Sequence, residues 1–169
     1  MPDPVETLIV LVEAAVAIAG FSGVVIVFGR RATGEWSRIE HARIRNLLLA
    51  ALSVLFLSLL TLVLLHAGTA PATTWRIGSG MWSLIAIQRL VVTIRNYARI
   101  PKEDPERPGI MVNTILFGVS AIIVSLNLGN VFALKEFSPF FAALVWFFAV
   151  TCYSFARLLF SQSRGGQAA

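Results

Sequence analysis

Charged residues are scarce in this sequence: they make up 14% of its 169 residues, against about 25% in an ordinary soluble domain. Hydrophobic residues reach 57%, and they gather in long runs rather than at amphipathic spacing. This composition excludes a typical soluble globular domain and a disordered chain. The single cysteine, Cys152, excludes a disulfide scaffold. Together these shortages indicate an integral membrane protein.

Motifs that carry common chemistries are also missing. The sequence has no GxxxxGK[ST], GxGxxG, HExxH or CxxC pattern. Its two histidines, His41 and His66, are predicted at opposite faces of the membrane, so a shared metal site or haem ligation is not expected. Asp3 and Asp104 lie outside the apolar runs, which excludes intramembrane proteolysis by paired aspartates. We therefore expect no enzyme, no metal and no cofactor.

Five apolar stretches are each long enough to cross a bilayer, which takes about 20 residues. They cover residues 5–28, 45–65, 77–94, 110–131 and 139–160. The connections between them are too short to hold a separate soluble domain. We expect an all-α integral membrane bundle of five transmembrane helices. It would form one domain over residues 1–160, followed by a disordered tail at 161–169.

The basic residues favour one orientation of these spans. If all five stretches cross, only Arg76 and Lys135 lie on one side, and the basic residues that flank the spans elsewhere lie on the other. The positive-inside rule then places the N-terminus outside and the C-terminus in the cytoplasm. Lys102 and Lys135 are the only lysines among 14 basic residues, which favours a GC-rich bacterial genome and hence the bacterial inner membrane. No basic stripe interleaves with exposed aromatic residues, so no nucleic-acid partner is expected despite the net charge of +5.

Short motifs predict where helices begin and end. Asp3 can cap the first helix, with Pro4 as its first residue. Ser138-Pro139 predicts a similar start for the fifth helix, and Ser37 with Glu40 matches a capping box before the second. Gly68 and Pro71 predict the end of the second helix.

Glu13 is the main candidate for a functional residue. It lies about 12 Å along the first span, where a carboxylate costs about 2.5–3.5 kcal/mol even on insertion scales. The side chain must therefore face helices or water, or be protonated. Two interpretations stay open, namely a proton or cation site and a neutral glutamate bonded to a partner helix. Candidate partners are Arg89, next to Gln88, and Asn127; alternatively, Arg89 extends to the cytoplasmic interface.

Small residues surround Glu13 on the first span. Ala15, Ala19 and Gly23 form a small-xxx-small row beside Gly20, and such rows let helix backbones approach closely. This pattern predicts packing against other spans or against copies of the same chain. Ser22 is expected to bond back to its own helix.

A basic segment follows the first span. Its arginines can bind anionic lipid headgroups, or they can simply be topology signals on the solvated first turns of the second helix. These lipid-headgroup candidates are Arg30, Arg31, Arg38, Arg43 and Arg45.

The stretch Glu13-Ala-Ala-Val-Ala-Ile-Ala-Gly20-Phe21-Ser22-Gly23, followed by Arg30-Arg31, resembles a recurring opening of uncharacterised small bacterial multi-pass membrane proteins. In these, a glutamate also precedes a Gly-Phe-Ser-Gly step by about two turns. The resemblance covers about a fifth of the chain. It implies a membrane location and marks Glu13 and residues 20–23, but it carries no activity.

Two functional classes follow. The first is a non-enzymatic membrane component, a structural or interaction subunit that associates with itself or with another membrane protein in the lipid bilayer. The alternative is a small oligomeric ion channel or proton-coupled transporter that uses Glu13. The first class is favoured because Glu13 is the one acidic residue clearly inside a span, and relays usually need several.

Overall fold

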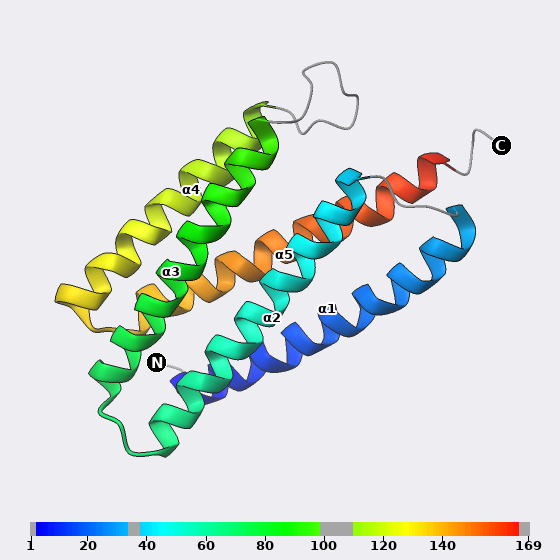
Figure 1. The fold of residues 1–169 in the computed structure, drawn as a ribbon. Coiled ribbons are helices and arrows are strands. Elements are labelled where there is room, and N and C mark those ends of the chain that lie inside the picture. The colour runs from blue at the N-terminus through cyan, green and yellow to red at the C-terminus, as the bar shows by residue number, and fades with distance from the viewer. Residues whose placement is uncertain (1–2, 34–37, 99–109, 166–169) are drawn as a thin grey trace. The chain divides into compact units, whose positions relative to one another are not determined.

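The computed structural model describes residues 3–33, 38–98 and 110–165, and within them every regular element is a helix (Figure 1). The elements are α1 (Pro4–Thr33), α2 (Arg38–His66), α3 (Pro71–Ala98), α4 (Ile110–Gly129), the π-helix η1 (Asn130–Leu134) and α5 (Phe137–Gly165). Five stretches are long and apolar enough to span a membrane: Pro4–Val24, Ile44–His66, Pro71–Ala98, Met111–Leu134 and Phe137–Arg157. The predicted all-helical fold with five helices of spanning length is confirmed, and these helices are compatible with a multi-pass membrane protein.

The first helix begins as the sequence predicts. The backbone N–H of Val5 donates to Oδ1 of Asp3 at 3.0 Å, so the aspartate side chain satisfies one of the N–H groups that an α-helix leaves without an internal acceptor. Pro4 is the first helical residue, where its missing N–H has no consequence. Ser37, the expected cap of the second helix, lies outside the described residues.

The turn from α2 to α3 uses Gly68 at positive φ, 78°. The N–H of Thr69 donates to the carbonyl of Leu64, and that of Gly68 to the carbonyl of Leu65, both at 3.0 Å. These two bonds form a Schellman motif, in which a left-handed residue, usually glycine, follows the last helical turn. The sequence signal at Gly68 and Pro71 is thus confirmed as the end of α2, and Pro71 at once begins α3.

Several helices run further than the apolar stretches predict. α3 begins six residues before the expected residue 77, and η1 carries the fourth helix to Leu134, beyond 131. The predicted start at Ser138-Pro139 is wrong, because α5 begins at Phe137. Pro139 still lies in the first turn, where backbone N–H groups have no internal acceptor, so the N–H that proline lacks is not needed there. Residues 161–165 continue α5 to Gly165, and the predicted disordered tail stays a prediction.

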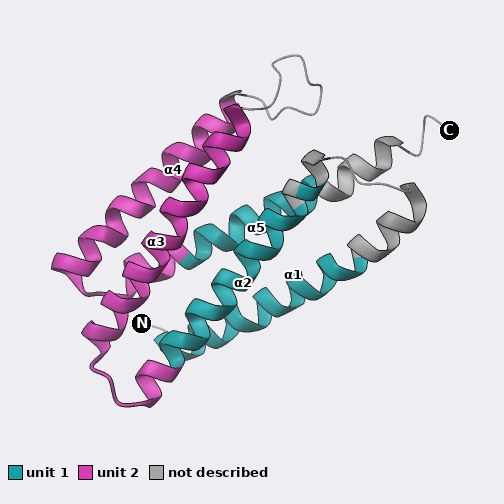
Figure 2. Cartoon of the chain, in the orientation of Figure 1, with its two compact units in different colours: residues 1–62, 144–169 teal, residues 63–143 magenta. Residues whose placement is uncertain are grey.

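The chain divides into two compact units (Figure 2). Unit 1 comprises residues 1–62 and 144–169, and its buried apolar side chains come from α1, α2 and α5. Unit 2 comprises residues 63–143, and within it α3 packs against α4 and η1. The expectation of a single transmembrane domain stays a prediction.

Candidate functional site

Glu13 lies on the exposed face of α1, near the middle of the apolar stretch Pro4–Val24. The residues that follow it on this face, at the i+4, i+7 and i+11 positions, are exposed as well. Within the described part of the chain, Glu13 forms no hydrogen bond or ion pair. We name this surface the α1 face: Glu13, Ala17, Gly20 and Val24.

The small residues beside Glu13 do not share one environment. Ala15 is buried, Ala19 and Gly23 are half-buried, and Gly20 is exposed. A Cβ atom built on Gly20 or Gly23 would meet nothing within 4 Å, so no neighbouring helix of the described chain approaches either glycine closely. Close packing at these positions therefore stays a prediction for a second copy. Ser22 does bond back to its own helix, since its hydroxyl donates to the carbonyl of Ile18 at 2.6 Å.

The expected partners of Glu13 lie in unit 2. Arg89 is half-buried and Gln88 is exposed, both on α3, and Asn127 is fully buried on α4. Because Glu13 belongs to unit 1, its pairing with any of them stays a prediction. Of the lipid-headgroup candidates, Arg45 is exposed on α2, whereas the side chains of Arg30, Arg31, Arg38 and Arg43 lie outside the described residues.

Asn127 connects α4 to the start of α5. Its Nδ2 donates to the carbonyls of Ile123 and Pro139, each at 3.0 Å. Buried polar groups are normally hydrogen-bonded, yet its Oδ1 is buried without a hydrogen-bond donor among the described residues. The predicted bond between Asn127 and Glu13 stays a prediction. The structure shows the two bonds from Asn127 to backbone carbonyls.

Asn130 forms a second polar network in unit 2. Its Nδ2 donates to Oγ of Ser79 at 2.8 Å and to the carbonyl of Glu136 at 2.9 Å, while its Oδ1 accepts the N–H of Glu136 at 2.8 Å. One buried amide thus joins α3, η1 and the entry to α5. Sequence reasoning missed this network. The available signal is a polar residue at the end of an apolar run, seven residues before a helix start.

Aromatic side chains pack beside this network. The ring of Trp75 lies 4.9 Å from that of Phe137 and 6.4 Å from that of Phe140, measured between centroids. Gly78, one turn further along α3, faces Phe140 directly, since a Cβ atom there would lie 2.9 Å from Cε2 of that ring. Only a glycine permits this close approach.

Two basic residues lie beside η1. Nε of Arg76 donates to the carbonyl of Val131 at 2.9 Å, which satisfies one of the carbonyls that a helix end leaves free. Lys135 ends the π-helix in the left-handed region, at φ 57°, and its N–H donates to the carbonyl of Asn130. Both side chains are exposed.

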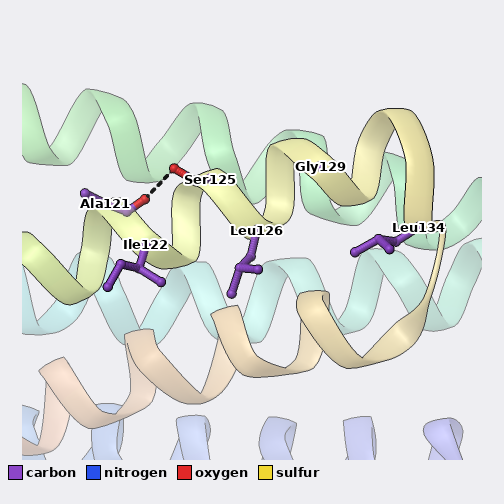
Figure 3. A pocket seen from close by; sticks show the side chains of 6 residues that line it. All are labelled: Ala121, Ile122, Ser125, Leu126, Gly129 and Leu134. Carbon is purple, nitrogen blue, oxygen red and sulfur yellow. Dashed lines mark hydrogen bonds between the residues drawn. The ribbon is translucent and has the colours of Figure 1, made fainter.

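An apolar groove of about 450 Å³ runs along α4 and η1 (Figure 3). The side chains of Ile122 and Leu126 project from the same side of α4 in this view. The hydroxyl of Ser125 donates to the carbonyl of Ala121 at 2.9 Å, so its one hydrogen-bond donor is already engaged. The groove residues are Ala121, Ile122, Ser125, Leu126, Gly129 and Leu134.

Comparison of the chain with protein-family models, with curated proteins and with solved structures finds no match. Among the residues that the structure describes, no group of three or more His, Cys, Asp or Glu side chains is placed to hold a metal ion.

Proposed function

We propose that this chain is a non-enzymatic, multi-pass protein of the bacterial inner membrane that associates with a second copy of itself through the α1 face. The observation that carries the proposal is the exposure of Glu13 near the middle of an apolar stretch of spanning length. The N-terminus lies outside and the C-terminus in the cytoplasm, as the distribution of basic residues favours.

A carboxyl group on a lipid-facing surface is unfavourable. Insertion of an acidic residue at the centre of a spanning helix costs about 2.5–3.5 kcal/mol, and such residues usually face a bundle interior or a water-filled cavity. A partner helix that supplies a hydrogen bond to Glu13 removes part of this cost. The α1 face therefore gains stability when another polar surface covers it.

A second copy fits this surface for two reasons. The residues that follow Glu13 include Ala17 and Gly20, and small residues let two helices approach closely. In a dimer with two-fold symmetry the same surface meets itself, so the two Glu13 carboxyl groups come together when one of them is protonated. A carboxylic acid and a carboxylate then share a strong charge-assisted hydrogen bond.

Cysteine crosslinking in membranes tests the association. In a Cys152→Ser background, Gly20→Cys is expected to give crosslinked dimers, because the added side chain meets nothing within 4 Å in its own chain. Leu84→Cys on α3 is the matched control, since Leu84 is 70% exposed but lies outside the α1 face. Equal crosslinking of the two variants, or none in either, would contradict the proposal.

Substitution of Glu13 tests the role of the carboxyl group. We expect Glu13→Leu to weaken dimerisation about three- to thirty-fold, which corresponds to one interhelical hydrogen bond of about 0.6–2 kcal/mol. Glu13→Gln keeps a hydrogen-bonding group and should retain more of the dimer. Dimerisation unchanged in Glu13→Leu would show that another surface carries the association.

The same exposed glutamate supports a second candidate function, an oligomeric ion channel or proton-coupled transporter. Assembly of several copies around the α1 face would place a ring of Glu13 side chains along one pathway. Loss of ion flux in Glu13→Gln with the oligomer intact would favour this function over a purely structural one.

A further inference from the structure

The fold brings Arg76 to the π-helix η1 that Lys135 ends, although 58 residues separate the two in the chain. They are also the two basic residues that the topology leaves on the outer side of the membrane. The bond from Nε of Arg76 to the carbonyl of Val131, at 2.9 Å, fixes the guanidinium group beside η1. Lys135 ends the same π-helix. A positively charged site thus lies at the end of η1.

The charges of this site are available to a ligand. Within the described part of the chain, neither Arg76 nor Lys135 forms an ion pair, and the adjacent Glu136 is exposed. The bond to Val131 uses only Nε of Arg76, so the remaining N–H groups of the guanidinium can donate to another acceptor. An arginine and a lysine together suit a phosphate group, since arginine supplies a planar fork of donors and lysine a mobile point charge.

The apolar groove on α4 and η1 ends next to Lys135 in the chain, and neither cation lines it. Its last lining residue, Leu134, immediately precedes Lys135. From Ala121 to Leu134 the groove follows 13 helical steps, about 20 Å, which exceeds the thickness of one leaflet, about 15 Å, in a hydrocarbon core about 30 Å thick. A long hydrocarbon chain fits such a lining, because the groove offers no unengaged polar side chain.

We propose that this groove and the two cations form a binding site for an anionic phospholipid of the outer leaflet. One acyl chain lies along the groove, and the phosphate binds Arg76 and Lys135. A free phosphate would use the cations and leave the groove empty, whereas a phospholipid uses both features. The site requires the membrane insertion proposed above, but it does not require self-association.

Native mass spectrometry of the purified full chain tests the site with phosphatidylglycerol and phosphatidylcholine as probes. The unmodified protein should retain phosphatidylglycerol in preference to phosphatidylcholine. Lys135→Gln, which leaves the bond from Arg76 to Val131 in place, should weaken phosphatidylglycerol binding about fivefold, the effect of one basic residue near a membrane surface. Adding Arg76→Gln should weaken it about fivefold again. Arg95→Gln is the charge control, because Arg95 is exposed in the last turn of α3, away from η1.

A second pair of variants tests the groove. Gly129→Leu should fill it without a clash, because a Cβ atom there meets nothing within 4 Å, and should lower retention of both lipids. Gly118→Leu is the matched control, since Gly118 lies on the same helix in equally open space but does not line the groove. Thermal unfolding of each variant confirms that it is folded.

Several results would overturn the site. Equal retention of phosphatidylglycerol by the unmodified protein and by the variant with both Lys135→Gln and Arg76→Gln would contradict the headgroup site. Equal effects of Gly129→Leu and Gly118→Leu on lipid retention would contradict the acyl-chain site. Displacement of phosphatidylglycerol by equimolar inorganic phosphate would show a free-anion site instead. Alkaline extraction of membranes separates the two proposals: a chain that stays in the membrane but shows no lipid preference contradicts only the lipid site.

Discussion

The side chain of Asn130 binds both backbone groups of Glu136, accepting its N–H at 2.8 Å and donating to its carbonyl at 2.9 Å. The same amide also donates to Ser79. This arrangement sets the entry to α5 and joins it to α3. Backbone polar groups without hydrogen-bond partners are costly in a membrane. The amide of Asn130 supplies partners to the backbone N–H and carbonyl of Glu136, which lies between η1 and α5.

Removal of this amide should destabilise the protein. Asn130→Leu leaves the N–H and carbonyl of Glu136 without these bonds, and we expect a loss of about 2 kcal/mol in the free energy of unfolding. Denaturation in detergent micelles measures it. The control is Ser125→Ala, which removes only a bond within its own helix turn and should change stability by less than about 0.5 kcal/mol. Equal stability of the two variants would show that the Asn130 network contributes nothing.

The sequence predicts most of the fold, because apolar runs of about 20 residues have few structural alternatives in a membrane. Helix ends that depend on local chemistry are also predicted, as at Asp3 and Gly68. The starts of α3 and α5 are not, because neither helix begins where its apolar run begins: α3 begins at Pro71, soon after the turn at Gly68, and α5 begins at Phe137. The bonds of Asn130 set the entry to α5, and the pairing of Arg76 with η1 cannot be read from residue spacing. The lipid groove likewise depends on side-chain directions that a one-dimensional pattern does not contain.

The packing of Gly78 on Phe140 predicts a sensitive position. In Gly78→Ala the new Cβ would lie 2.9 Å from the ring of Phe140, which is fully buried and has little room to move. We expect a loss of about 1–3 kcal/mol from overpacking, measured by denaturation in micelles. Gly118→Ala is the matched control on α4; it meets no neighbour and should gain up to about 1 kcal/mol from helix propensity.

A second substitution gives an independent check of this contact. Phe140→Leu shortens the side chain, so it should reduce the penalty of Gly78→Ala in the double variant. Contacting residues show such non-additivity, typically about 0.5–3 kcal/mol. Strictly additive effects would mean that the two residues do not touch.

The proposed orientation predicts which loops are accessible from outside the cell. In a Cys152→Ser background, Ala67→Cys places a thiol at an exposed position between α2 and α3, and a membrane-impermeant maleimide should label it in intact cells. Lys102→Cys lies between α3 and α4 in the sequence and should react only after permeabilisation, as the positive-inside rule requires. The reversed labelling pattern would show that the topology is inverted. Labelling of both cysteines in intact cells would show that α3 does not cross the membrane.

Liposome measurements separate the two proposed functions of Glu13. An interaction subunit should conduct no protons or cations, whether wild type or Glu13→Gln, under an applied gradient and membrane potential. A channel should conduct as wild type and lose flux in Glu13→Gln, because the amide cannot carry a charge.

Glu6→Gln is the matched control: Glu6 is also exposed on α1 but lies in its first turn, at the membrane edge. Flux lost equally in both variants would indicate a general effect of charge at the entrance. Flux lost only in Glu13→Gln, with Gly20→Cys crosslinking unchanged, would make the α1 face the lining of a pathway rather than a simple contact surface.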